Sequence, residues 1–241
     1  MRILVAGGSG VIGRNLIPML VQKGHAVTGT TRSAAKTNLI TSLGAKALIL
    51  DVFDQVLVRH AVSAARPDVI IHQLTDLPDV ADPSKAAEMA ETNARLRIDG
   101  TRHLMDAAKA ARVKRVIAQS VAWLYAEGPE PHGERDVLNL KATGPLRRSL
   151  EGILALESAV TGTPGVEGIV LRYGPFYGSG TWTSKPNGRG PVHVEAAACA
   201  AALAVDHGKP GIYNIAEDDG FLKIAKARKE LGFDPAMRSI D

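Results

Sequence analysis

The sequence is poor in cysteine, aromatic residues and long apolar runs, and each shortage excludes a class of protein. A single cysteine, Cys199, leaves no intrachain disulfide and no cysteine-only metal site, and its alanine-rich surroundings favour a buried helix residue over a nucleophile. Aromatic residues make up 4% of the chain and the net charge is only +4, which does not favour a nucleic-acid-binding surface. The apolar runs are no longer than strands, so no membrane span is expected.

The same absences predict the location of the protein and its lack of a metal. The first residues do not show the charged region, long apolar stretch and cleavage site of a secretory signal, and a single cysteine is typical of a reducing compartment. We therefore expect a cytoplasmic protein without a membrane or nucleic-acid partner. His72 has no second histidine or carboxylate at a ligand spacing, so no metal site is predicted.

The chain opens with a strand that leads directly into a glycine-rich turn. Apolar residues 3–5 are followed by glycines at positions 7, 10 and 13, and a helix is predicted from position 11. Glycines at this spacing allow a tight turn, close approach of the backbone to a diphosphate and close packing of helix on strand. The free amides of the helix N-terminus favour negative charge. Against the alternative of a ligand-free turn, we predict that a dinucleotide is bound by Gly7, Ser9, Gly10, Val11, Ile12 and Gly13.

Strand and helix patterns alternate along the rest of the chain. Short runs rich in Val, Ile and Leu predict strands over residues 2–6, 26–30, 46–50, 68–72, 115–119 and 167–172. Helices are predicted over residues 11–23, 55–65, 84–111 and 150–160. This alternation implies an α/β fold with a doubly wound parallel sheet, whose ligands bind at the carboxyl ends of the strands.

The residues after the second strand predict which dinucleotide is bound. They are Thr31, Arg32 and Ser33. Folds that prefer NAD usually place an acidic residue here for the ribose hydroxyls, whereas an arginine with hydroxyl neighbours suits a 2′-phosphate. NADP is therefore predicted as the cofactor in preference to NAD, and a solvated loop arginine is the alternative reading of Arg32.

The ends of the third and fourth strands predict the rest of the cofactor site. Asp51 is expected to accept from the adenine amino group and Val52 to pack on the ring. The alternative role of Asp51 is an N-cap for the helix that begins at position 55. Leu74 and Thr75 are expected to border the central ribose and the nicotinamide.

Several longer segments carry a family resemblance. They are the glycine turn and residues 51–52, 99–108, 113–120, 171–178, 192–197 and 211–215. In these segments and in their order, the chain resembles the extended short-chain dehydrogenase/reductase family, which includes the NAD(P)-dependent sugar epimerases and dehydratases. The resemblance implies a Rossmann domain over residues 1–178 and a small substrate subdomain over 179–241 that interleaves with the last sheet elements. It also implies a homodimer paired through the long helices beside the fourth and fifth strands.

The sequence departs from this family at the catalytic residues. The resemblance implies a Tyr-x-x-x-Lys pair on the helix after the fifth strand, in which tyrosine moves the substrate proton and lysine lowers the pKa of the tyrosine. In the matching register Ser149 stands at the tyrosine position and Ile153 at the lysine position, and no tyrosine of the chain is followed by lysine four residues later. Ser120 and Tyr125 are the replacement catalytic candidates, with packing or a pocket wall as the alternative role of each.

The substrate-binding region is also shorter than the family's. Only residues 179–191 and 216–221 stand where the family usually carries its two insertions. The chain therefore has either a reduced, truncated subdomain or segments missing from the sequence. We favour missing segments, because both gaps fall where a substrate lid would order on ligand binding.

Two functions are compatible with these residues. The first is an NADP-preferring oxidoreductase similar to epimerases and dehydratases, which acts on a nucleotide-sugar or a related carbonyl or hydroxyl compound without the usual catalytic pair. The second is a non-catalytic NADP-binding regulatory or sensor protein. We favour the first, and the retained Arg32 and Asp51 argue against a Rossmann fold without any ligand.

Overall fold

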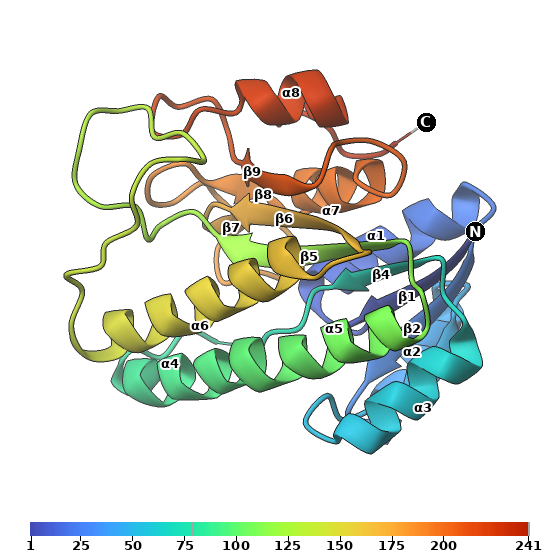
Figure 1. Cartoon of the computed structure of the whole chain (residues 1–241). Helices are drawn as coiled ribbons and strands as arrows, with labels where there is room; N and C mark the ends of the chain where they lie inside the picture. Colours follow the sequence, from blue (N-terminus) through green and yellow to red (C-terminus); the bar gives the residue numbers. More distant parts are fainter. Residues whose placement is uncertain (79, 241) are drawn as a thin grey trace.

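Seven parallel strands form one sheet in the computed structural model, which describes residues 1–78 and 80–240 (Figure 1). They are β1 (Arg2–Ala6), β2 (Ala26–Thr31), β3 (Lys46–Ile49), β4 (Val69–His72), β5 (Arg115–Val121), β6 (Glu167–Tyr173) and β9 (Gly211–Ile215). Their order across the sheet is β3-β2-β1-β4-β5-β6-β9, and every neighbouring pair runs parallel. The strand order reverses between β1 and β4, and in such sheets a ligand crevice opens at this point.

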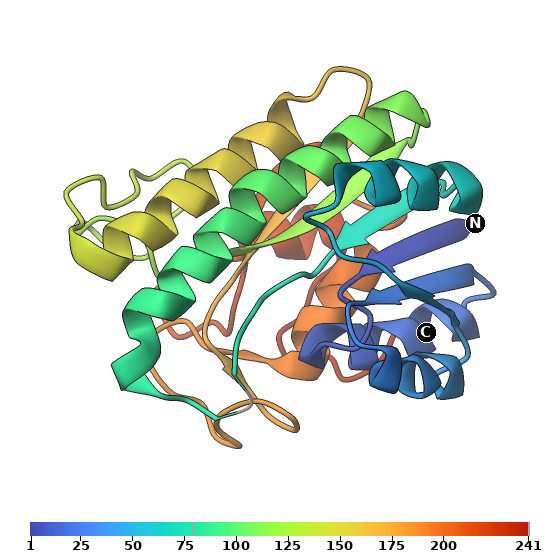
Figure 2. The ribbon, with the colours of Figure 1, turned by 90° about the horizontal axis from the view of Figure 1, so that it is seen from below.

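Helices cover both faces of the sheet, as Figures 1 and 2 show. They are α1 (Val11–Gln22), α2 (Thr37–Ser42), α3 (Gln55–Ala65), α4 (Ala86–Arg95), α5 (Thr101–Ala110), α6 (Gly144–Gly162), α7 (Val194–Leu203) and α8 (Ala225–Leu231). Ile3 and Val5 of β1 share a core with α1, α2, α7 and α8, while Leu4 and Ala6 share a second core with α3, α5 and α6. Alternate residues of one strand therefore supply two cores. Within the described part of the chain, no helix combines the length and apolar character needed to cross a membrane.

The strands predicted from the sequence are confirmed, with ends that differ by at most two residues. The predicted helix over 84–111 occurs as α4, the π-helical turn η3 (Leu96–Gly100) and α5, which run on from one another beside α6 in Figure 2. The prediction for α6 was wrong at its start, since the helix begins at Gly144 rather than at position 150. Its polar first turns are stabilised by a tertiary contact, the ion pair from Arg148 Nε to Glu91 Oε2 of α4 at 2.7 Å.

Part of the segment that follows residue 178 lies in the main sheet. β9 pairs with β6, and α7 packs against α1. Two short strands, β7 (Phe176–Tyr177) and β8 (Val192–His193), form a separate parallel pair. The domain boundary at residue 178 and the substrate role of the region beyond it stay predictions.

A buried ion pair joins α6 to β6. The Arg172 guanidinium donates to both carboxylate oxygens of Glu157, with Nη2–Oε2 and Nε–Oε1 distances of 2.6 and 2.8 Å, and the two side chains are 5% and 8% exposed. Ser120 Oγ also donates to Glu157 Oε1 at 2.7 Å, and Arg172 Nη1 donates to the Tyr125 hydroxyl at 2.8 Å. The bidentate geometry and the added bonds satisfy both buried charges.

Breaking this pair should be costly. Glu157→Gln should lower the free energy of unfolding by roughly 3–5 kcal/mol, because the buried Arg172 charge loses its counter-charge. The control is Asp218→Asn, which breaks the exposed pair with Arg228 (Nη1–Oδ2, 2.8 Å). That change should cost less than about 1 kcal/mol. Guanidinium chloride denaturation measures both, and equal losses would contradict the structural role of the buried pair.

A second buried polar residue, His72, joins the end of β4 to the start of α5. Its Nδ1 accepts from the Leu74 amide at 3.2 Å, so Nε2 carries the proton of the neutral ring and donates to Thr101 Oγ1 at 3.0 Å. Burial, and then the charge of Arg97, lowers the pKa of His72 to about 4. The residue therefore has a structural role, which is to hold the loop that follows β4.

The neutral His72 should make stability depend on pH. Its folded pKa lies below the value of 6.5 expected when unfolded, so the unfolded state takes up a proton first as the pH falls. Stability should decline between about pH 6.5 and about pH 4, by up to about 3 kcal/mol from this residue. His72→Asn should flatten the decline, and His60→Asn, at an exposed histidine of α3, should not. Urea denaturation at several pH values tests this, and an unchanged slope in the His72 variant would exclude the residue as the cause.

Candidate functional site

A cavity of about 1650 Å³ lies at the carboxyl ends of the strands, at the crevice between β1 and β4. Its wall combines residues that follow the ends of β1, β2, β4, β5 and β6 with side chains of α4 and α6. The predicted site residues that line it are Gly7, Ser9, Gly10, Val11, Thr31, Arg32, Ser33, Val52, Leu74, Thr75 and Ser120. Of the other predicted residues, Ile12, Gly13, Asp51 and Tyr125 are not among the described residues of the wall. Strand ends that are far apart in the sequence thus meet at one cavity.

The glycine turn brings α1 against the end of β1. Gly7 has a φ of +90°, which favours glycine, and a Cβ on Gly13 would lie 2.4 Å from the Gly7 carbonyl oxygen. In the described chain no side chain caps α1 at Gly10, so the first amides of the helix have no side-chain acceptor. An uncapped helix N-terminus at the edge of a cavity suits a phosphate group.

Arg32 extends from the end of β2 to the loop after β4. Its Nη2 pairs with Asp76 Oδ1 at 2.7 Å, and the arginine side chain is 48% exposed. Ser9 Oγ and the Ser33 amide both donate to Thr31 Oγ1, at 3.1 and 3.2 Å. The guanidinium is therefore accessible beside a cluster of hydroxyl groups.

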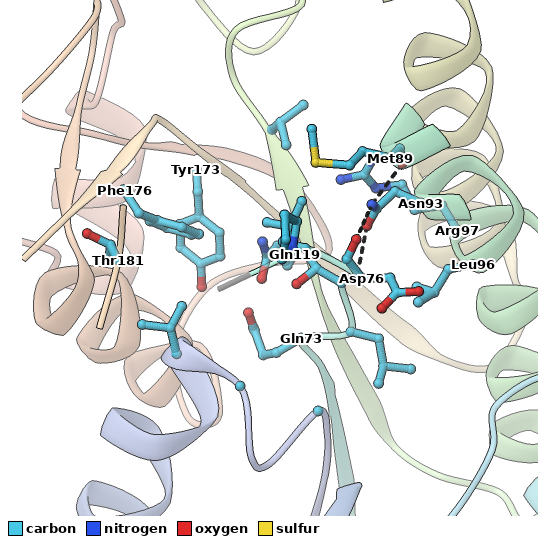
Figure 3. A pocket seen from close by; sticks show the side chains of 18 of the residues that line it. Gln73, Asp76, Met89, Asn93, Leu96, Arg97, Gln119, Tyr173, Phe176 and Thr181 are labelled. Carbon is cyan, nitrogen blue, oxygen red and sulfur yellow. Dashed lines mark hydrogen bonds between the residues drawn. The ribbon is translucent and has the colours of Figure 1, made fainter. Parts of the chain in front are cut away.

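Asn93 of α4 holds the loop that carries Asp76, and the sequence analysis did not identify it. Its Oδ1 accepts from the Asp76 amide at 2.9 Å and its Nδ2 donates to the Asp76 carbonyl at 2.8 Å (Figure 3). The sequence signal that could have identified Asn93 is a polar side chain on the buried face of a predicted helix.

The structure places Asp51 and Val52 in different surroundings, and their adenine contacts stay predictions. Asp51 is exposed, and its Oδ1 accepts from the Phe53 amide at 3.0 Å. Its alternative role as helix cap was wrong, because Asp54 caps α3 by accepting from the Leu57 amide at 2.9 Å. Val52 is buried and lines the cavity.

Ser149 and Ile153, the two α6 residues that the sequence register aligned with the expected catalytic pair, lie in different surroundings. Ser149 lines the cavity. Ile153 is fully buried in a core that includes Val121 and Leu150. α6 contains neither tyrosine nor lysine.

Ser120 and Tyr125 belong to the network around the Glu157–Arg172 pair. Ser120 is buried and uses its hydroxyl proton to bind Glu157. The Tyr125 hydroxyl donates to Asn214 Oδ1 at 2.7 Å and accepts from Arg172, and burial raises its pKa. Neither hydroxyl is free to move a substrate proton in this arrangement, so the geometry does not support the catalytic roles predicted for them.

The wall also contains the buried polar residues Gln73, Gln119 and Arg97 (Figure 3), of which Gln119 and Arg97 were not predicted as site residues. Gln73 is 4% exposed, and neither its carboxamide oxygen nor its nitrogen has a partner among the residues described. Gln73 and Gln119 could have been identified in the sequence as glutamines near the ends of apolar strands. Arg97 gave no comparable signal, because it lies in a helical segment with many polar residues.

An aromatic wall faces the polar one. Tyr173 and Phe176 lie across the cavity from Arg97 in Figure 3. Trp182 also lines the cavity and donates from Nε1 to the Pro78 carbonyl at 2.9 Å. Over the described residues there is no group of three or more His, Cys, Asp or Glu side chains that could hold a metal ion. The cavity thus combines cationic, amide and aromatic surfaces.

Comparison with known proteins identifies relatives of the chain. A family model described as the NAD dependent epimerase/dehydratase family matches residues 3–192. The chain is 36% identical to the 3-diazoavenalumate denitrifying reductase of a Streptomyces species, over 91% of this chain and 77% of that protein. It is 30% identical to the UDP-N-acetyl-alpha-D-glucosaminuronate decarboxylase of Bacillus cytotoxicus, over 73% of this chain and 55% of that protein.

The fold is similar to those of solved epimerase structures. The UDP-glucose 4-epimerase of Thermotoga maritima has a TM-score of 0.80 at 19% identity, covering 98% of this chain and 94% of that chain. The UDP-glucuronic acid 4-epimerase of Bacillus cereus, solved with NAD, has a TM-score of 0.75 at 18% identity, with coverages of 98% and 94%. These likenesses confirm the Rossmann-type sheet. The family model and the relatives together show that the chain belongs to the NAD dependent epimerase/dehydratase family.

Proposed function

We propose that the chain is an NADPH-dependent reductase whose reaction requires a hydride but no proton from α6, and that its substrate is a diazo-substituted aromatic compound. The observation that carries this proposal is the composition of α6, which places Ser149 at the cavity and buries Ile153 in the core. The 36% identity to a protein named as a denitrifying reductase of a diazo compound supports it.

The residues at the crevice fit a dinucleotide. A Cβ on Gly7 would lie 2.8 Å from the Gln73 carbonyl oxygen, so glycine leaves room where the backbones converge. The uncapped N-terminus of α1 would hold the diphosphate. Val52 and Leu74 would border the adenine and the central ribose.

Arg32 would bind the 2′-phosphate of NADP. To do so it would leave the Asp76 carboxylate and pair with the phosphate. Breaking the Arg32–Asp76 pair costs little free energy, because an exposed ion pair contributes at most about 1 kcal/mol. The planar guanidinium matches phosphate oxygens, and Ser33 and Thr31 supply hydroxyl groups beside it.

The chemistry of the substrate explains how the chain could work without the family's catalytic pair. When bound, NADPH supplies a hydride. A carbonyl that accepts hydride also needs a proton, and a sugar hydroxyl carbon that is oxidised must lose one, so both reactions depend on an acid or a base. An aryl diazonium carbon needs neither: a C–H bond forms, the C–N bond breaks, and N₂ leaves with the electron pair of the broken bond.

The protein would then only have to bind the substrate, orient it toward the cofactor and exclude water. Tyr173 and Phe176 would contact the flat substrate, and Ile153 keeps α6 packed on the core without a titratable group at the reacting carbon. Ser149 remains as a small hydrogen-bonding group at the wall.

Cofactor preference tests the role of Arg32. Wild-type protein should bind NADPH roughly tenfold to hundredfold more tightly than NADH, because the guanidinium forms charged hydrogen bonds to the 2′-phosphate. Arg32→Ala should remove this preference and leave NADH binding unchanged. Arg59→Ala, at an exposed arginine of α3, is the control. Isothermal titration calorimetry measures the affinities of all three proteins for both cofactors, and equal affinity of the wild type for the two cofactors would refute the assignment.

The reaction itself is tested with a diazotised aminobenzoate and with UDP-glucose. We expect NADPH oxidation and one N₂ per NADPH with the diazonium compound, above the rate without protein, and no turnover of UDP-glucose. Deuterium from cofactor labelled at its transferable position should appear on the ring. The value of kcat should stay flat from about pH 6 to about pH 9, because no protein acid is involved.

Two results would contradict the proposed reaction. Turnover of UDP-glucose without that of the diazonium compound would favour the nucleotide-sugar substrate that the resemblance implies. Tight NADPH binding with no turnover of either compound would favour the regulatory protein without catalysis.

A further inference from the structure

A buried cation projects into the cavity without a partner. Arg97 lies in the π-helical turn η3 between α4 and α5, is 8% exposed, and lines the cavity wall (Figure 3). It forms no hydrogen bond or ion pair from its side chain to any residue that the structure describes, and desolvation is the one cause that shifts its pKa. Single π turns inserted in α-helices occur frequently at functional sites.

The burial of this charge is unfavourable unless an anion joins it. Burial lowers the pKa of Arg97 to about 10, but the side chain still carries its charge at neutral pH. Arginine is almost never fully buried in a folded protein unless it is paired. The contrast with Arg172 is direct, since that buried guanidinium donates from Nε and Nη2 to Glu157 and from Nη1 to the Tyr125 hydroxyl.

The described cavity wall contains no unpaired carboxylate that could neutralise Arg97. Among the described lining residues the cationic side chains are Arg14, Arg32, Lys36 and Arg97, and the acidic side chain is Asp76. Asp76 is already paired with Arg32. An anion that neutralises Arg97 would therefore come from a ligand.

Arg97 lies in a turn that packs against α6, and its charge also acts on His72 at the end of β4. η3 packs against α6, and α4 approaches α6 so closely that a Cβ on Gly152 would lie 2.7 Å from Ala94 Cα. The phosphate sites proposed above lie at α1 and at the end of β2, which belong to the β1–β2–β3 half of the sheet. An anionic group of the substrate, rather than of the cofactor, fits the α6 side.

We propose that Arg97 binds a carboxylate of an aromatic substrate and thereby sets the specificity of the cavity for acids. The inference rests on the proposed function in one respect, that the second ligand of this cavity is aromatic. A planar guanidinium binds both oxygens of a carboxylate. Tyr173 and Phe176, across the cavity in Figure 3, provide the contact for the ring, and Gln119 lies between the two walls.

Binding measurements that need no turnover test the role of Arg97. The probes are para-hydroxycinnamate, its uncharged methyl ester, and UDP, each titrated calorimetrically into the protein with NADP present. The acid should bind the wild type roughly tenfold to hundredfold more tightly than the ester, because only the acid pairs with the buried cation.

Variants at position 97 should change this ratio and leave cofactor affinity unchanged. Arg97→Met should bring the acid and the ester to equal affinity, and Arg97→Lys should keep part of the preference. Arg102→Met, at an exposed arginine of α5, is the matched control and should keep the full preference. NADPH affinity should be the same in all four proteins, which also reports that the fold is intact.

Three outcomes would overturn the inference. Equal binding of acid and ester by the wild type would do so without any variant. Equal weakening of both probes in Arg97→Met would assign the residue a merely structural role, and loss of UDP or NADPH binding in that variant would assign it to a phosphate. Because no probe carries a diazo group, the proposed reaction can fail while the acid preference of Arg97 stands, and the reverse also holds.

Discussion

The contact between Gly13 of α1 and the Gly7 carbonyl at the end of β1 sets the position of every other part of the site. A Cβ at position 13 would come within 2.4 Å of that oxygen, so the helix can approach the strand only through glycine. This approach directs the uncapped helix terminus at the crevice where the strand order reverses. The loops after β2 and β4 then meet above it, and the Arg32–Asp76 pair bridges them.

The cavity divides into two halves with different chemistry. The β1–β2 half has glycines, hydroxyl groups and an accessible arginine, which suit the phosphates of a dinucleotide. The other half has the buried Arg97 and an aromatic wall across from it, but α6 itself offers no tyrosine or lysine. We infer that the family's cofactor cradle is combined here with a substrate that needs no proton from the protein.

Much of the fold was predictable from the sequence because it depends on local patterns, whereas the site depends on distant partners. Buried parallel strands read as short apolar runs, and β1 to β6 were found in this way. The start of α6 was missed because Arg148 is stabilised by Glu91 of another helix. Tyr125 looked available in the sequence, but Asn214 and Arg172 bind its hydroxyl from β9 and β6. Arg97 could be recognised only when its burial was known.

The central claim is that one cavity holds NADP on its β1–β2 half and an aromatic acid on its α6 half, with no protein acid at the reacting carbon. A crystal structure of the ternary complex with NADP and para-hydroxycinnamate tests this most directly. The account predicts the diphosphate at the N-terminus of α1, the 2′-phosphate on Arg32, and the carboxylate on Arg97 with its ring against Phe176. A carboxylate placed away from Arg97, or the Tyr125 hydroxyl within hydrogen-bonding distance of the ring substituent next to the nicotinamide, would contradict it.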